Sequence, residues 1–196
     1  MFKINEIFYS LQGEGFHTGT PAVFVRFCGC NLRCAFCDTR HQEGVTMSLE
    51  EIAGEVNKFP NASMVVLTGG EPSLFIDEDF VRELKQMTDK MIAIETNGTR
   101  PLPTNLDWVT FSPKTGFEGG DVEPPVLTQC DELKVVYLGQ KLSRYDEIKA
   151  SYRFLQPCFS ENESQRLANM KSCVEAVLNN SGWRLSLQIH RVLNIR

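Results

Sequence analysis

The sequence lacks several features that mark whole classes of protein. No run of about 18 apolar residues is present, which argues against a membrane-spanning helix. The first residues, MFKINEIFYS, lack the apolar core of a secretory signal. No block of Lys or Arg occurs, and the net charge is −5, so sequence-nonspecific binding to nucleic acid is disfavoured. We therefore expect a cytoplasmic protein that has neither a membrane nor a nucleic acid as partner.

The cysteine count does not fit a disulfide framework. Seven cysteines cannot all pair with one another, and a chain of 196 residues can bury a core without such cross-links. Hydrophobic residues make up 42% of the chain and charged residues 23%, as in ordinary globular proteins. We expect one domain over residues 1–196, whose thiols are reduced or bound to metal.

Short apolar runs alternate with helical patterns along the chain. Strands are predicted at 21–27, 63–69, 91–96, 108–112, 133–138, 153–157 and 184–190. Helices are predicted at 48–58, 77–88 and 144–150, and from a capping box of Ser160 and Glu163 to about Gly182. The last helix is expected to bury Leu167, Met170, Val174 and Val177. Strands that alternate with helices indicate an α/β fold with a mainly parallel sheet, and the Pro- and Gly-rich segment 113–131 is expected to be a surface loop.

Polar or reactive residues recur directly after the predicted strands. Examples are the cysteine-rich segment that follows residue 27, Gly70 and Glu71 after the second strand, and His190 at the end of the last one. The carboxyl ends of parallel strands lie at one face of the sheet, where α/β proteins build their sites. We therefore expect these segments to converge on one site.

The most specific motif is CGCNLRCAFCDT (28–39), in which Cys30, Cys34 and Cys37 have the spacing C-x3-C-x2-C. Closely spaced thiolates bind zinc or an iron–sulfur cluster. A structural zinc site needs four ligands, which could include Cys28. A 4Fe–4S cube held by three cysteines leaves one iron open to a small molecule. We expect Cys28 to pack beside the cluster and the remaining cysteines, Cys130, Cys158 and Cys173, to be core or neutral residues.

The cysteine motif, with Phe36 before its last cysteine and with TGGEP (68–72) about thirty residues later, resembles that of the radical S-adenosylmethionine (SAM) enzymes. The segments YSLQGEG, PAVFVRF, CDT, ETNGT, SPK and LSLQIHRVLNIR resemble, in order, those of the 7-carboxy-7-deazaguanine synthase family. The resemblance implies a shortened, modified TIM-like partial barrel. It also implies conversion of 6-carboxy-5,6,7,8-tetrahydropterin to 7-carboxy-7-deazaguanine with loss of ammonia, on the route to queuosine.

The same resemblance implies the cofactors and their ligands. Cys30, Cys34 and Cys37 would hold a 4Fe–4S cluster that binds SAM, and Thr39 is the family's Mg²⁺ position. SAM is expected to contact Phe36, Cys37, Asp38, Gly70, Glu71, Thr96, Asn97, Ser112, Pro113, Lys114 and Gln156. Cleavage of SAM would give a radical that takes a hydrogen from C6 of the pterin, after which SAM is regenerated. An alternative for Glu71 and Lys114 is a solvated ion pair at a sheet end.

The pterin is expected to contact Leu11, Gln12, Gly13, Glu14, Arg26, Thr68, Glu95, His190 and Arg196. Glu95 can accept two parallel N–H bonds from a guanidine-like edge. Arg26, the only charge in its strand, would bind the substrate carboxylate, with an internal ion pair as the alternative. The apolar residues Val192, Leu193 and Ile195 are expected to pack down and to fix the terminal carboxylate of Arg196 near the pterin.

The resemblance also implies a homodimer and an electron donor such as flavodoxin or ferredoxin. Two other functions remain open from the sequence. One is a radical SAM activase that acts on a glycyl-radical partner protein. The other is a noncatalytic zinc-binding module.

Overall fold

The structure is a computed structural model that describes residues 1–37, 39, 42–114 and 123–196. Its strands form one sheet in the order β3-β1-β2-β4-β5-β6-β7-β8-β9. These strands are β1 (Phe2–Leu11), β2 (Pro21–Phe27), β3 (Val45–Met47), β4 (Met64–Gly69), β5 (Met91–Thr96), β6 (Trp108–Phe111), β7 (Gln129–Tyr137), β8 (Lys149–Pro157) and β9 (Arg184–Leu185). The helices are α1 (Leu49–Asn57), α2 (Glu78–Thr88), α3 (Glu163–Asn179) and α4 (Ile189–Leu193), with short 3-10 helices at Pro72–Leu74 and Leu142–Tyr145.

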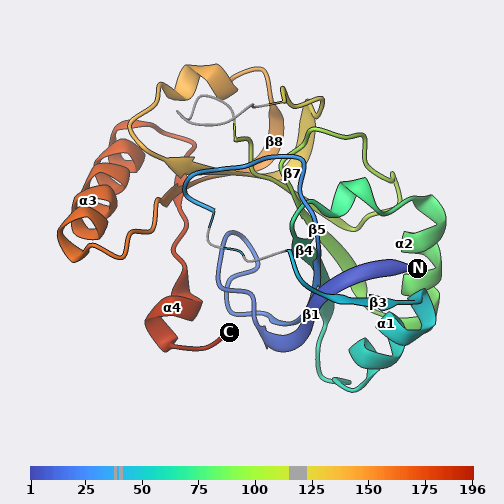
Figure 1. Cartoon of the computed structure of the whole chain (residues 1–196). Helices are drawn as coiled ribbons and strands as arrows, with labels where there is room; N and C mark the ends of the chain where they lie inside the picture. The colour runs from blue at the N-terminus through green and yellow to red at the C-terminus, as the bar shows by residue number, and fades with distance from the viewer. Residues whose placement is uncertain (38, 40–41, 115–122) are drawn as a thin grey trace.

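The sheet is mainly parallel, as predicted. All neighbours from β2 to β9 pair in parallel, whereas β1 pairs antiparallel with both β2 and β3. Figure 1 shows the curved sheet with α1, α2 and α3 outside it. In the described residues β3 and β9 are the two free edges, so the sheet is a partial barrel rather than a closed one.

Successive side chains along each strand point alternately toward the helices outside the sheet and toward its inner face. The outward residues of β2, β4 and β5, such as Val25, Leu67 and Ile94, pack against α1 and α2 and are fully buried. The inward residues along β2 are Ala22, Phe24 and Arg26, and those on the other parallel strands follow the same period of two. Apolar side chains therefore fill the base of the barrel, and polar ones are left at its mouth.

Several predictions about the second half of the chain were wrong. Residues 144–150 do not form a helix, since the short 3-10 helix ends at Tyr145 and β8 begins at Lys149. The cap of α3 is Asn162, whose side chain accepts from Gln165 N, and Ser160 instead accepts from Asn162 N.

The predicted apolar face of α3 was also largely wrong, although Val177 packs against the core as a partly buried residue. The helix buries only Cys173 and Ala176, and Leu167 is 62% exposed. The helix packs mainly on β8 and β9 near the edge of the sheet, so its buried face is narrow.

The last predicted strand is mostly not a strand. Only Arg184–Leu185 pair with β8, after which the chain leaves the sheet and forms α4, which carries His190. Strands β1 and β3 were not predicted. The segment 113–131 was expected to be a loop, but β7 already begins at Gln129, and residues 115–122 lie outside the described part. No described helix is long and apolar enough to span a membrane.

Candidate active site

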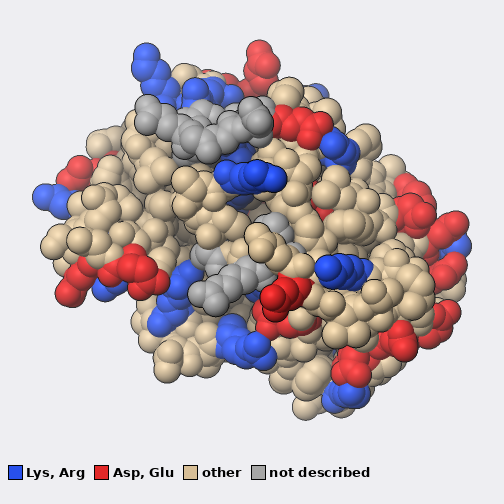
Figure 2. Space-filling view, viewed as in Figure 1, with Lys and Arg blue, Asp and Glu red and all other residues tan. Residues whose placement is uncertain are grey.

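A cavity of about 1190 Å³ lies at the mouth of the partial barrel. Figure 2 shows Lys and Arg side chains around the centre of this face. The predicted residues that line the cavity are Leu11, Gln12, Gly13, Glu14, Arg26, Cys30, Cys34, Phe36, Cys37, Thr39, Thr68, Gly70, Glu71, Glu95, Thr96, Asn97, Ser112, Lys114, Gln156, His190 and Arg196. Pro113 is buried but does not line it, and Asp38 lies outside the described residues. The polar residues that follow the predicted strands therefore meet at one cavity, as expected.

The cysteine-rich loop packs backbone to backbone against the end of β4. Glu71 N donates to Gly29 O (2.8 Å), and a Cβ placed on Gly70 would lie 1.8 Å from the same oxygen. The close approach predicted for Gly70 is thus made to the protein's own loop. Any side chain at position 70 would push the cysteine loop away from the sheet.

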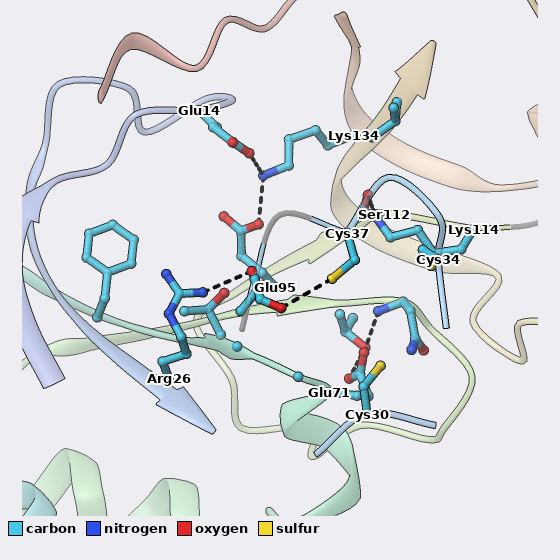
Figure 3. A pocket seen from close by; sticks show the side chains of 18 of the residues that line it. Glu14, Arg26, Cys30, Cys34, Cys37, Glu71, Glu95, Ser112, Lys114 and Lys134 are labelled. Atoms are coloured by element: carbon cyan, nitrogen blue, oxygen red, sulfur yellow. Dashed lines mark hydrogen bonds and ion pairs between the residues drawn. The ribbon is translucent and has the colours of Figure 1, made fainter. Parts of the chain in front are cut away.

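Three thiols of this loop face the cavity (Figure 3). Burial raises the pKa of Cys30 and of Cys34, which favours the protonated thiols. Because metals bind thiolates, these protons are released when a metal binds. Among the described residues, no group of three His, Cys, Asp or Glu side chains lies close enough together to hold a metal ion. The donor set nevertheless fits an iron–sulfur cluster, because three soft thiols lie on one short loop and Leu32 N already donates to Cys30 Sγ (3.4 Å).

Cys28 differs from the three thiols in the way the sequence predicted. Its Sγ donates to Glu43 O (3.0 Å), and the side chain is buried. Burial raises the pKa of its thiol. Cys28 therefore anchors the chain that returns from the cysteine loop.

Glu71 joins the ends of two strands. Its carboxylate accepts from Ser73 N (3.1 Å), Thr96 Oγ1 (2.7 Å) and Asn97 N (2.7 Å), and the residue is 1% exposed. A solvated ion pair is therefore the wrong description of Glu71. Asn97 Nδ2 extends the link to Asn31 Oδ1 (3.1 Å) in the cysteine loop. This network holds the loop in register with β4 and β5.

Lys114 follows β6 and points back into the cavity. Its Nζ donates to Ser112 Oγ (2.6 Å) and lies 5.9 Å from the centre of the Phe36 ring. Burial lowers the pKa of Lys114, and the nearby Cys34 opposes that shift. The amino group of Lys114 therefore lies beside the cysteine loop, and a solvated ion pair does not describe it either.

Three charged side chains form a cluster at one end of the cavity, which we call the Lys134 cluster: Glu14, Glu95 and Lys134. The ammonium of Lys134 donates to Glu14 Oε2 (2.6 Å) and Glu95 Oε2 (2.7 Å) (Figure 3). Burial opposes ionisation of Glu14, but Lys134 outweighs it and lowers the pKa of Glu14 to about 2. Burial would lower the pKa of Lys134, and the facing carboxylates raise it instead.

Arg26 and the chain terminus meet at Glu6. Glu6 accepts from Arg26 Nε (2.9 Å) with one oxygen and from a terminal nitrogen of Arg196 (2.6 Å) with the other. Arg26 therefore has the internal ion pair that the sequence left as its alternative, while its side chain still lines the cavity. A terminal nitrogen of Arg26 also donates to Thr39 Oγ1 (3.3 Å).

The C-terminal tail returns to the mouth, as predicted, but polar contacts hold it there. Ser10 Oγ donates to Arg196 O, and Ile195 N donates to His190 O (3.0 Å). The apolar anchors were predicted wrongly, since Val192 is 79% exposed and Leu193 is 54% exposed. A tail of six residues has too little apolar surface to bury when it lies at the rim of a polar cavity.

His190 packs on the loop that follows β1. A Cβ on Gly13 would lie 2.3 Å from His190 Nδ1, so any larger residue at position 13 would displace the imidazole of His190. Ile189 N donates to Gly13 O (3.0 Å), and Gln188 Nε2 donates to Glu14 Oε1 (2.9 Å). The start of α4 thus fixes the loop that carries the predicted substrate residues.

Sequence reasoning missed four residues of this end of the site, namely Glu132, Lys134, Ser186 and Gln188. Lys134 is the only charge in the predicted strand 133–138, and Glu132 lies directly before that strand. A lone charge in an apolar strand is the signal that identified Arg26, so Lys134 was detectable. Ser186 and Gln188 carried no such signal, because the segment was read as a strand.

The buried carboxyl group of Glu132 is expected to make the stability of the fold depend on pH. Burial raises its pKa to about 7, although Lys134 and the N–H of Phe16 act in the other direction. A pKa above the unfolded value of 4.5 means that stability is present at low pH and is lost as the pH rises toward 7. Glu132→Gln has no such titration and keeps an acceptor for Phe16 N.

We expect wild type to lose about 1 kcal/mol relative to Glu132→Gln between about pH 6 and pH 8. This corresponds to a difference of roughly 3 °C in Tm, measured by circular dichroism under anaerobic conditions. Melting curves of the two proteins that shift in parallel with pH would show that Glu132 does not titrate in this range.

Comparisons with known proteins agree with the fold and with the family that the motifs indicate. A sequence model described as the Radical SAM superfamily matches residues 24–126, more than half of the chain. The 7-carboxy-7-deazaguanine synthase of Bacteroides thetaiotaomicron is 53% identical over 196 residues, covering 100% of both chains. That of Burkholderia multivorans is 36% identical over 222 residues, covering 99% of each.

Solved structures extend the comparison. The crystal structure of QueE from Escherichia coli matches with a TM-score of 0.74 at 29% identity, covering 95% of this chain and 93% of that one. SuiB from Streptococcus suis, seen bound to its precursor peptide SuiA, is 16% identical with a TM-score of 0.56 and covers 80% of this chain and 46% of its own. The likeness to SuiB concerns the fold alone.

The fold, the cysteine motif and the matched family place this chain in the radical SAM superfamily. Within that superfamily, the chain belongs to the 7-carboxy-7-deazaguanine synthase family. It is a radical SAM enzyme with 7-carboxy-7-deazaguanine synthase activity in queuosine biosynthesis, as the motifs predicted. A glycyl-radical activase and a zinc-binding module are no longer needed as alternatives.

Proposed function

We propose that the cavity binds SAM and 6-carboxy-5,6,7,8-tetrahydropterin together and converts the pterin to 7-carboxy-7-deazaguanine with release of ammonia. The observation that carries this proposal is the uneven charge of one cavity. Carboxylates line one part of it at the Lys134 cluster, and Arg26 lies away from Lys134, on the far side of Glu95 (Figure 3). A pterin with a donor edge and a carboxylate on opposite sides matches this arrangement.

The cysteine loop and the strand ends beside it would hold the cofactors. Cys30, Cys34 and Cys37 are the proposed ligands of a 4Fe–4S cluster, which would supply one electron to bound SAM. Lys114, close to Cys34 and Phe36, would place a positive charge next to the anionic cluster and the SAM carboxylate. Glu71 keeps the loop in place through its bonds to Thr96 and Asn97.

The opposite wall would orient the pterin. Glu95 would accept N–H bonds from the guanidine-like edge with the acceptor capacity that Gln12 and Lys134 leave free. Arg26 would receive the substrate carboxylate, sharing its guanidinium with Glu6. The terminal carboxylate of Arg196, held by Ser10, would accept further N–H groups.

We also propose that Thr39 is a ligand of Mg²⁺. Its hydroxyl lies at the cavity beside Arg26, so a magnesium ion there would contact the same substrate carboxylate. Replacing Thr39 with alanine is expected to lower pterin turnover by about tenfold or more, since the ion loses one ligand while Arg26 remains. The iron content and the Kd for SAM should stay near wild type.

The Thr39 prediction is checked by titrating Mg²⁺ against turnover in Thr39→Ala and in the control Thr46→Ala, whose side chain is exposed on β3. The control should keep the wild-type magnesium response. A parallel loss of SAM affinity and turnover in Thr39→Ala would assign Thr39 to SAM rather than to magnesium.

Two partners complete the proposal. The exposed Arg33, between two of the cysteines, supports docking of an acidic electron donor such as flavodoxin or ferredoxin close to the cluster. The exposed apolar residues Val192 and Leu193 on α4 support a homodimer, as the family resemblance implies.

The experiment that tests the proposed reaction is a defined anaerobic turnover. The reconstituted enzyme, SAM, a low-potential reductant and 6-carboxytetrahydropterin should give equal amounts of 7-carboxy-7-deazaguanine and ammonia. Cys30→Ala serves as the control and should give neither. Cleavage of SAM without consumption of the pterin would contradict the proposal.

A further inference from the structure

We propose that Lys134 is a positioning residue for the pterin: it holds the carboxyl groups of Glu14 and Glu95 side by side as hydrogen-bond acceptors, which makes this end of the cavity specific for a ring edge that presents N–H donors. This inference rests on the proposed function and adds the residue that sets its substrate specificity. Lys134 belongs to no motif of the sequence. Its place in the site follows only from the geometry of the Lys134 cluster.

The position of Lys134 is unusual for a lysine. Its side chain is 4% exposed and projects from β7, an interior strand of the sheet, into the cavity (Figure 3). A lysine is seldom buried without partners, and both partners here come from distant parts of the chain. Glu14 lies in the loop after β1 and Glu95 near the end of β5. The ammonium thus ties two separate walls of the cavity together.

The remaining oxygens of the two carboxylates are also fixed. Gln188 Nε2 donates to Glu14 Oε1 (2.9 Å), and Gln12 Nε2 donates to Glu95 Oε1 (3.1 Å). Each carboxylate therefore has both oxygens oriented, yet two oxygens offer about four acceptor sites in all. The unused sites are available to a ligand in the cavity, which both glutamates line.

The charges in the Lys134 cluster do not cancel. Two carboxylates face one ammonium, so the cluster carries an excess negative charge in a largely buried place. Glu132 lies beneath it on β7, and its own pKa is raised by burial. The other titratable groups that act on the cluster are His190 of α4 and Lys114 after β6. Buried negative charge is stabilised when donors complete it, and the N–H groups of a pterin edge are such donors.

Without the ammonium, the two acceptors would not survive as a pair. Both carboxylate oxygens touch one nitrogen, at 2.6 and 2.7 Å, so they lie within about 5 Å of each other. Two carboxylates this close and this buried would share a proton, because like charges and burial both disfavour the second ionisation. The shared proton would turn an acceptor into a donor that faces the donors of the ring. Lys134 prevents this mismatch.

The test compares Lys134→Met with wild type and with Lys171→Met, a matched change at an exposed position of α3. We expect the KM for 6-carboxytetrahydropterin to rise by at least about 30-fold near neutral pH in Lys134→Met, the loss typical of charge-assisted hydrogen bonds. The Kd for SAM and the iron content should change by less than about twofold. The elevated KM should fall again as the pH rises, because both carboxylates then ionise, whereas the wild-type KM should stay flat.

A second measurement needs no variant and so does not depend on folding. Wild type is expected to bind the 2-oxo analogue of the substrate, 6-carboxytetrahydrolumazine, at least about 100-fold more weakly than the pterin, because an acceptor then replaces the amino group that faces a carboxylate. Lys134→Met should discriminate much less between the two.

Three results would overturn the proposal. One is a pterin KM in Lys134→Met that stays near wild type at every pH. Another is a loss of SAM affinity and iron content in parallel with pterin affinity, which indicates a purely structural role. The third is equal binding of the pterin and its 2-oxo analogue to wild type. Failure of wild type to turn over the pterin at all would instead overturn the proposed function.

Discussion

Replacing Cys30, Cys34 or Cys37 singly with alanine is expected to abolish cluster assembly and SAM cleavage to the limit of detection. Three thiolates are the least that holds a cube with one open iron, and all three thiols face the same cavity. Loss of any one leaves two ligands on a loop that has little regular structure of its own. Iron analysis, the broad absorption near about 400 nm and the rate of SAM cleavage measure the effect.

Cys28→Ala is the matched control, since it lies in the same loop. Cys28 also lines the cavity, but its thiol is buried and donates to Glu43 O. We expect this variant to keep its cluster and its SAM cleavage, with some loss of stability from the lost packing. A Cys28→Ala protein that is colourless and inactive would show that the ligands are misassigned.

Deleting residues 191–196 is expected to lower kcat/KM for the pterin by roughly 100-fold while cluster content and SAM binding persist. The deletion removes the terminal carboxylate at the mouth together with the Arg196–Glu6 ion pair. Each charge-assisted bond of this kind contributes on the order of a tenfold effect or more. The ion pair itself is partly exposed, so most of the effect should come from the carboxylate.

A smaller change separates these contributions. Ser10→Ala removes only the hydroxyl that holds Arg196 O, and it should raise the pterin KM by a few-fold with kcat little changed. Amidation of the terminal carboxylate should act in the same direction. Normal pterin kinetics in the truncated enzyme would show that the tail has no role in pterin binding.

Much of the fold and of the site was predictable because the sequence alternates between short apolar runs, typical of buried strands, and apolar residues at helical spacing. The apolar strands β2, β4 and β5 were located to within a residue or so, and the Ser48 capping box placed the start of α1. Once the strands were known, the parallel pairing put their carboxyl ends at one mouth. Nearly every predicted site residue lines that mouth for this reason.

The errors arose from strand pairing and tertiary contacts, which the local sequence pattern does not reveal. Strand β1 pairs antiparallel with β2 near the margin of the sheet, and its apolar alternation is interrupted where the register shifts between Ile4 and Glu6. The last predicted strand, 184–190, pairs over only two residues because the chain turns at Ser186 to pack on the loop after β1. Tertiary contacts therefore decided the position of His190, although its place at the cavity was predicted.

Interactions across the cavity were the hardest to foresee. The sequence identified Glu14 through resemblance and Glu95 also as a polar residue at a strand end, but it did not reveal that Lys134 joins them. For Arg26, the predicted alternative of an internal ion pair is present, because Glu6 lies on the neighbouring strand opposite it. Such pairs depend on strand register, which single-sequence reasoning does not fix.

The central claim is that the pterin lies in this cavity next to SAM, with C6 open to hydrogen abstraction. The most direct test is one turnover with substrate deuterated at C6, followed by mass analysis of the recovered SAM. We predict that SAM becomes heavier by the mass of one deuterium as 7-carboxy-7-deazaguanine forms. Product formation with unlabelled SAM, and with deuterium retained elsewhere, would contradict the account.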